Sequence, residues 1–184
     1  MVAYHIGQLL IASPRLTDPN FARAVILILD HDADGALGVV VNRPSELPLR
    51  AVLPPWAEAV TEPQVLFAGG PVAPESALGV GLCIGAGPAD GFRRLVGDYG
   101  LVDLDFEPGD LLPDLVGVRV FSGYAGWGGG QLEYEIGVGS WYVVNAAPGD
   151  LLDPEPDRLW RTVLRRQVGE LAYVANFPAD PRLN

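Results

Sequence analysis

Residues 122–133 constrain the fold more than any other part of this chain, because five glycines fall within eight positions around Tyr124 and Trp127. Glycine is used where a backbone turns tightly or where another group approaches it closely. Bare backbone beside two large aromatic rings indicates a shaped surface for a small ligand or a partner. The segment contains no evident nucleophile, base or metal ligand. The sequence therefore indicates a site more clearly than a reaction.

The length of 184 residues suits one domain, and a chain of this size buries about 70% of the surface exposed when unfolded. We therefore treat residues 1–184 as a single domain. Apolar residues make up 49% of the chain, yet runs such as 24–29 are far shorter than the roughly 20 residues that cross a bilayer. The N-terminus lacks the basic lead and apolar stretch of a signal peptide. These features predict a cytoplasmic protein without a membrane segment.

The net charge of −11 disfavours direct binding to DNA or RNA, because that affinity comes largely from neutralising phosphates. All twelve basic residues are arginines. The absence of lysine excludes P-loop nucleotide binding, Schiff-base catalysis and a Ser-Lys dyad. The partners that we expect are a protein or a small anionic ligand.

The cysteine and histidine content gives no support for a metal site or another cofactor. The single Cys83 cannot form an internal disulfide, and its apolar neighbours indicate a buried side chain. His5 and His31 are too isolated to form a metal-binding pair. Residues 30–35 begin like a calcium loop, but Val41 stands where the closing glutamate is needed. We interpret this segment as a hairpin turn instead.

Apolar runs separated by turn residues dominate the first 120 positions and are typical of strands. They cover residues 6–12, 24–30, 36–42, 65–68, 78–84, 100–106 and 116–121. Residues 47–60 indicate a short helix that Pro54 and Pro55 break or kink. Residues 88–99 are compatible with either a short helix or a loop.

The clearest helical signal covers residues 158–169, after an acidic, proline-containing lead. Its apolar stripe consists of Trp160, Val163, Leu164, Val168 and Leu171, and its basic face of Arg158, Arg161, Arg165 and Arg166. The basic face could bind an acidic partner, but pairing with the acidic lead is the stronger interpretation.

Two hypotheses remain for the glycine-rich segment. If residues 131–136 form a helix, its free N–H groups could hold a carboxylate or phosphate. Alternatively, the glycines only let the backbone turn while Tyr124 and Trp127 pack inward. Glu133 and Glu135 would point to different faces of such a helix, so we expect solvent-exposed carboxylates rather than an acid/base pair.

Several blocks together carry a family resemblance. They are residues 7–14, 18–21, His31 with 35–38, 42–44, 69–72, 123–127 and 131–133. Their order and spacing, over almost the whole chain, are similar to those of the YqgE/AlgH family. The resemblance implies an α+β single domain in which a bifurcated mixed β-sheet forms a partial barrel flanked by helices. It also implies a bacterial cytosolic protein. It implies no established reaction, although one branch is provisionally labelled a transcriptional regulator.

The residues that match the family motifs are predicted to line one ligand- or partner-binding cleft. They are Ser13, Asn42, Arg43, Gly70, Gly123, Tyr124, Trp127 and Gln131. Arg43 would be the polar anchor of that cleft.

These observations favour a non-enzymatic cytosolic binding protein that holds a small ligand or another protein. Any effect on transcription would then run through a protein partner, because the chain is acidic. The alternative is an enzyme of unknown class. Its acid/base groups would be His31, the aspartates beside it or Glu133, assembled near the glycine-rich segment. A pocket joining His31 to that segment would favour the enzyme.

Overall fold

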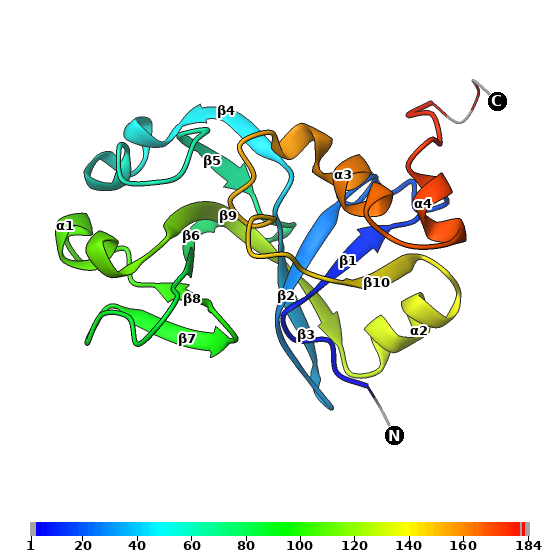
Figure 1. The fold of residues 1–184 in the computed structure, drawn as a ribbon, viewed down its shortest axis with the longest axis horizontal. Coiled ribbons are helices and arrows are strands. Elements are labelled where there is room, and N and C mark those ends of the chain that lie inside the picture. Colours follow the sequence, from blue (N-terminus) through cyan, green and yellow to red (C-terminus); the bar gives the residue numbers. More distant parts are fainter. Residues whose placement is uncertain (1–2, 181, 183–184) are drawn as a thin grey trace.

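Ten strands form one curled sheet with short helices packed around it (Figure 1). The computed structural model describes residues 3–180 and 182. The main path of the sheet runs β10-β1-β2-β3-β9-β6-β8-β7, and β4 and β5 attach beside β9. The strands are β1 (Gln8–Ala12), β2 (Val25–Asp32), β3 (Gly35–Val40), β4 (Pro44–Pro48), β5 (Val65–Ala68), β6 (Val72–Leu82), β7 (Phe92–Val96), β8 (Tyr99–Val102), β9 (Gly117–Gly128) and β10 (Trp141–Asn145).

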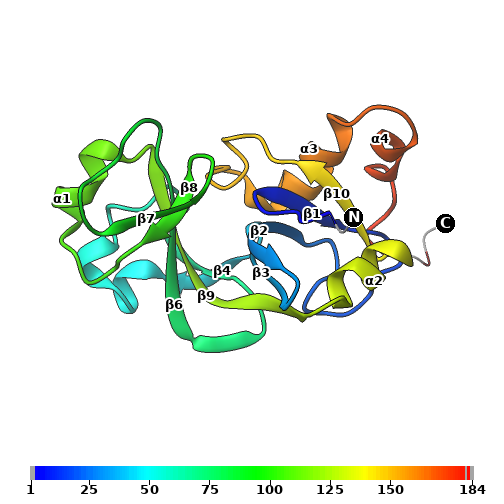
Figure 2. The ribbon, with the colours of Figure 1, turned by 90° about the horizontal axis from the view of Figure 1, so that it is seen from below.

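The helices are short and lie between the strands and after β10. They are α1 (Pro108–Leu111), α2 (Gln131–Gly137), α3 (Leu159–Arg165) and α4 (Glu170–Val174), with 3-10 turns η1 (Leu49–Ala51), η2 (Pro54–Trp56), η3 (Leu112–Asp114) and η4 (Pro156–Arg158). Figure 2 shows the curl of the sheet, with β7 and β8 on one side and β1 and β10 on the other. No helix of the described residues has the length and apolar character needed to cross a membrane.

Strand β9 is the point at which the sheet forks. One of its edges pairs antiparallel with β6. The other edge pairs in parallel with β5 at Phe121 and Ser122 and then antiparallel with β3 from Ala125 to Gly128. The partner on this edge therefore changes at Gly123 and Tyr124, and the mixed sheet divides there into two branches.

The fork brings two backbones into direct contact. The Gly69 N–H donates to the Ser122 carbonyl at 2.8 Å, and the Gly69 carbonyl accepts from the Val40 N–H at 2.9 Å. Gly123 has a φ of +69°, and a Cβ placed on it would lie 2.5 Å from the Gly70 carbonyl oxygen. Only glycine satisfies both this conformation and this approach.

The alternation of side chains along the strands divides the apolar core between the two faces of the sheet. On β1, Leu9 and Ile11 join the cluster under α3, whereas Leu10 and Ala12 join the cluster under α2. A third cluster, around Trp56, packs η1, η2 and α1 against the branch that contains β8. The helices therefore cover faces that the curled sheet leaves open.

The predicted fold class is confirmed: a single α+β domain with a bifurcated mixed sheet curled into a half-barrel. The hairpin at residues 30–35 is also confirmed, since Asp32 pairs with Gly35. The glycine-rich segment is not a free bend, because residues up to Gly128 continue strand β9. Of its glycines, Gly123 and Gly129 approach other backbone atoms closely, whereas Gly130 has a φ of +77° in the turn before α2.

Three strands were not predicted, and one predicted helix is shorter than expected. Residues 44–48 and 141–145 form β4 and β10, and part of 88–99 forms β7. The helix expected at 158–169 ends at Arg165, and α4 follows as a separate helix. Trp160, Val163 and Leu164 are buried as predicted, but Val168 is 91% exposed because the chain has left the helix there.

Gly123→Ala is predicted to lower the free energy of unfolding by about 3 kcal/mol, because it adds positive-φ strain and overlap with backbone atoms. Gly137→Ala is the matched control, since a Cβ there meets no atom within 4 Å. Urea denaturation measures both variants. An unchanged midpoint for Gly123→Ala would show that the fork tolerates a side chain.

Candidate functional site

One carboxylate, that of Glu135, holds the indole rings of Trp127 in the glycine-rich segment and Trp141 in β10. Glu135 Oε2 accepts hydrogen bonds from Trp127 Nε1 at 3.0 Å and Trp141 Nε1 at 2.8 Å, and Gln131 donates to Oε1 at 3.0 Å. Phe21 stacks on Trp127 and meets Trp141 edge to face. Trp127 is 7% exposed. Phe21, Trp127 and Trp141, here called the ring cluster, therefore pack against one another. The inward packing predicted for Trp127 is confirmed.

Helix α2 follows the glycine-rich segment as expected, but it does not offer an anion site. It has seven residues, and the Gly128 N–H before it donates to Gln131 Oε1 at 3.1 Å. The expectation that Glu133 and Glu135 are solvent-exposed is wrong. Both side chains are half-buried and bonded, because the turn of α2 packs against β3, β9 and β10.

His31 uses both of its ring nitrogens within the protein. Its Nδ1 accepts from the His5 N–H at 3.1 Å, so the proton is on Nε2, which donates to Glu133 Oε1 at 2.9 Å. The side chain is fully buried. Asp30 and Asp32 lie on the opposite, exposed face of β2, because side chains alternate along a strand. The aspartates beside His31 in sequence are therefore not beside its ring.

Asn42 and Arg43 organise the loop before β2. Asn42 donates to the Arg23 carbonyl at 2.9 Å and accepts from the Val25 N–H at 2.8 Å. Arg43 donates to the carbonyls of Pro19, Asn20 and Ala22. Burial lowers the pKa of Arg43, and nearby Asp18 partly opposes that shift. The guanidinium that was predicted to anchor a ligand thus anchors the chain itself.

The predicted site residues fall into two groups. Gly70, Gly123 and Tyr124 meet at the fork of the sheet, with Trp127 of the ring cluster and Gln131 of α2 following in the chain. Ser13, Asn42 and Arg43 form the second group, which lies at a pocket away from the fork. Ser13 lines that pocket, and the other two hold the loop that forms one of its walls.

This pocket, here called the basic pocket, has a volume of about 440 Å³. Residues 13–17 after β1, residues 22 and 23 before β2, and residues 177–179 after α4 form its walls. Arg15, Phe177 and Pro14 also border an adjoining hollow of about 340 Å³ that adds Tyr142 and Val174. The combined space offers polar and apolar surface side by side.

Two guanidinium groups meet at the Phe177 carbonyl, where Arg23 lines the basic pocket and Arg161 lies outside its lining. Arg23 Nη2 and Arg161 Nη2 both donate to the Phe177 carbonyl, at 2.6 and 3.4 Å. Neither arginine forms an ion pair with a carboxylate of the described residues. Burial lowers the pKa of Arg23, and repulsion from Arg161 lowers it further. An anion placed here would relieve that repulsion.

Two residues that line the basic pocket, Arg23 and Ser13, have unusual features. Arg23 has a φ of +56°, a conformation that residues other than glycine rarely adopt. Its guanidinium lies 4.3 Å from the ring centroid of Trp160. Ser13 is 1% exposed, and its hydroxyl has no hydrogen-bond partner among the described residues. A buried hydroxyl without a partner costs free energy, so a ligand that reached it would gain a hydrogen bond.

Sequence reasoning identified Ser13 here but missed Arg15, Arg23 and Phe177. The pocket forms from three segments that are far apart in the chain, so no local spacing marks it. The one available signal was the arginine content of an acidic chain, because unpaired basic residues in such a chain need an explanation.

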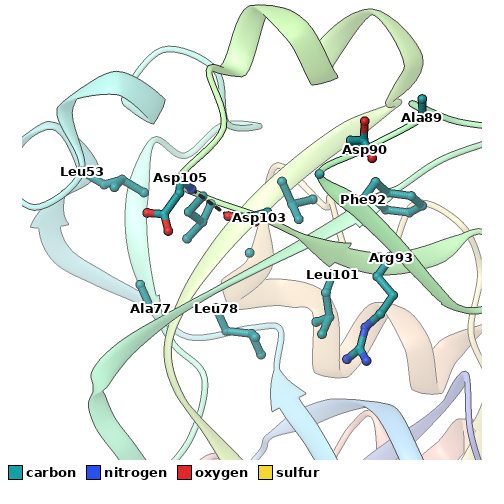
Figure 3. A pocket seen from close by; sticks show the side chains of 14 residues that line it. Leu53, Ala77, Leu78, Ala89, Asp90, Phe92, Arg93, Leu101, Asp103 and Asp105 are labelled. Carbon is teal, nitrogen blue, oxygen red and sulfur yellow. Dashed lines mark hydrogen bonds between the residues drawn. The ribbon is translucent and has the colours of Figure 1, made fainter.

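A larger cleft of about 720 Å³ lies in the other branch of the sheet (Figure 3). Leu78 from β6, Leu101 from β8, Phe92 from β7 and Leu53 contribute apolar walls. Asp90, Asp103 and Asp105 bring carboxylates to its rim. None of the predicted site residues lines this acidic cleft.

Comparisons with known proteins match the chain to one family model and to bacterial relatives. Residues 9–172 match the model of the AlgH-like family, DUF179. A UPF0301 protein of Streptomyces coelicolor is 53% identical, over 97% of this chain and 94% of that protein. A UPF0301 protein of Streptomyces avermitilis is 54% identical with the same coverage.

Two solved structures are similar to this fold. A crystal structure of a Corynebacterium diphtheriae protein has a TM-score of 0.89 and 35% identity, over 96% of this chain and 94% of that one. The solution structure of the AlgH protein from Pseudomonas aeruginosa has a TM-score of 0.68 and 28% identity, over 97% and 96% of the two chains.

The hydrogen bond between His31 and Glu133 predicts a loss of stability in acid. The pKa of Glu133 lies below its ordinary value of 4.5, because its own backbone N–H and His31 donate to the carboxylate. A carboxylate whose pKa is lower in the folded state than in the unfolded state stabilises the fold at a pH above its unfolded-state pKa. This stabilisation is lost as the pH falls through the folded-state pKa. Glu133→Gln should therefore be less stable than the parent at pH 7, and the difference should shrink below pH of about 4.5. Urea midpoints from pH 7 to pH 3 test this. A constant difference would contradict it.

Proposed function

This chain belongs to the AlgH-like family, and from that premise we propose that it is a non-enzymatic cytosolic protein that binds a small organic anion in the basic pocket. The observation that carries the proposal is that Arg23 and Arg161 meet without an ion pair to any described carboxylate, in a chain of net charge −11. Elsewhere an acidic surface repels anions, so a local excess of guanidinium groups selects where an anion binds.

The chemistry of the pocket defines the class of ligand. Guanidinium groups form forked hydrogen bonds with carboxylates and phosphates. Phe177, Leu16 and the adjoining Tyr142 provide apolar surface beside them. We therefore expect an anionic group at Arg15 and Arg23 and an apolar or aromatic portion against Phe177.

The surroundings of His31 support a binding protein over an enzyme. Both ring nitrogens of His31 already form hydrogen bonds within the protein, one with the His5 N–H and one with the Glu133 carboxylate. A shallow hollow of about 230 Å³ joins Asp30, Asp32 and Asp34 to Trp127, but His31 does not line it. A regulatory role would follow if the occupied pocket changed the contacts of a protein partner.

Arg15→Gln is predicted to weaken the binding of benzoate and phenyl phosphate at least about fivefold, because it removes one charged donor from the pocket. Arg15 is exposed and lines both hollows, so folding should not change. Arg165→Gln, on the exposed side of α3, is the matched control for net charge. Titration of ¹⁵N-labelled protein measures affinity and location together. Equal weakening by both variants, or shifts outside residues 13–23 and 177–179, would overturn the proposal.

Ser13→Ala separates ligand binding from folding. The variant removes a buried hydroxyl without a partner, so the melting temperature of the free protein should stay the same or rise. Binding of benzoate should weaken, because the ligand loses a hydrogen bond. A free protein destabilised by more than about 1 kcal/mol would show that the hydroxyl already has a structural role.

A further inference from the structure

The acidic cleft lies in the branch of the sheet away from the basic pocket, so it is a separate surface (Figure 1). In Figure 3, Leu53, Asp105 and Asp103 lie on one side of it, and Asp90, Phe92 and Arg93 lie on the other. The cleft opens where β8 ends at Val102 and the chain turns away from β6. Its lining therefore comes partly from β6, β7 and β8 and partly from the loops that contain residues 89–91 and 103–105.

The charge of this cleft is unbalanced. Asp90, Asp103 and Asp105 are exposed, and none forms an ion pair with a described residue. Arg93 is the basic residue among those lining the cleft. Three carboxylates against one guanidinium attract a cationic partner, and no described contact neutralises them.

The cleft continues into a second hollow along β6. That hollow has a volume of about 290 Å³, shares Leu53 and Ala77 with the cleft, and adds Glu75 and Val52. The two hollows meet at these shared residues and form one groove, whose second part is also lined by Leu66, Val120 and Ser122. Its apolar side chains, together with Glu75, extend the same combination of apolar surface and negative charge.

The backbone of β6 along this groove has an open edge. Strand β8 pairs only with Gly79–Leu82 of β6. Residues 72–78 of β6 therefore have β9 as their partner strand in the described chain. The pairing with β9 also jumps from Val72 to Ala77, so residues 73–76 bulge out of the ladder. Within the bulge, Ala73 has a φ of +47° and Pro74 has no N–H, so the part of the edge that can pair with an added strand is residues 75–78.

We propose that this groove binds an extended segment of a protein partner, in which basic and apolar residues alternate, as an added strand beside β6. An extended chain places successive side chains on opposite faces. One face would present cations to Asp90, Asp103 and Asp105, and the other would place apolar side chains against Leu78 and Leu101, which pack in a different core cluster from Leu53. The groove is independent of the basic pocket, so the proposal does not rest on anion binding.

The test uses a fluorescein-labelled hexapeptide of alternating lysine and valine and the full-length protein. Fluorescence anisotropy should show saturable binding, and a glutamate-valine peptide should not bind. Hydrogen exchange at residues 75–78 should slow on binding, as strand addition requires. Asp103→Asn with Asp105→Asn should weaken binding about tenfold. Asp157→Asn with Glu170→Gln removes the same charge from exposed positions elsewhere and should leave binding unchanged.

Two results would overturn the proposal. Equal weakening in both double variants would indicate attraction by net charge alone. Competition by spermine at a matched concentration of charge, without slowed exchange at residues 75–78, would identify a site for small polycations instead. Because Arg15→Gln leaves the groove intact, failure of anion binding in that variant and failure of peptide binding here are distinguishable.

Discussion

The contact between residues 69–70 and strand β9 determines the architecture of the chain. Gly69 bonds to Val40 on one side and to Ser122 on the other, so one residue joins both branches of the sheet. The left-handed Gly123 lies against Gly70 and lets β9 exchange β5 for β3 as its neighbour. A Cβ at Gly70 or Gly123 would overlap backbone atoms, which explains why glycine occupies both positions. Within the glycine-rich segment, Gly123 therefore lets the two backbones cross.

Arginine side chains also hold together segments that are far apart in the sequence, through hydrogen bonds to backbone carbonyls. The buried Arg119 donates to the carbonyls of Leu151, Asp153 and Glu62 and lies over Phe67, and burial lowers its pKa to about 10. Arg43 holds the loop before β2 in the same way. A planar fork with several donors suits this use better than an ammonium group, which accounts for the exclusive use of arginine. Against this background, Arg15 and Arg23 differ, because both line the basic pocket and neither forms an ion pair within the described part of the chain. The position of these two arginines supports the binding of an anion in the basic pocket.

The sequence predicts the parts of this protein that depend on local pattern. Strand runs, the hairpin at Gly35 and the buried stripe of Trp160 follow from periodicity and turn chemistry. Strands β4, β7 and β10 were missed because they are short or partly exposed and gain their order from neighbouring strands. For the candidate site, Ser13 was predicted from the family resemblance. The roles of Arg23 and Phe177 could not be predicted, because these two residues are 154 positions apart and meet only in the folded chain. The roles of Glu133 and Glu135 were misjudged for the same reason, since their partners come from other strands.

Native-state hydrogen exchange at the amides of Val40 and Gly69 tests the central claim most directly. If the crossing of the two backbones holds both branches together, these amides should exchange only through global unfolding. Their free energies of exchange should then equal that of unfolding and fall with denaturant along the same slope. Exchange through a smaller, local opening, while the β1–β2 amides stay protected, would show that the fork is not what joins the sheet.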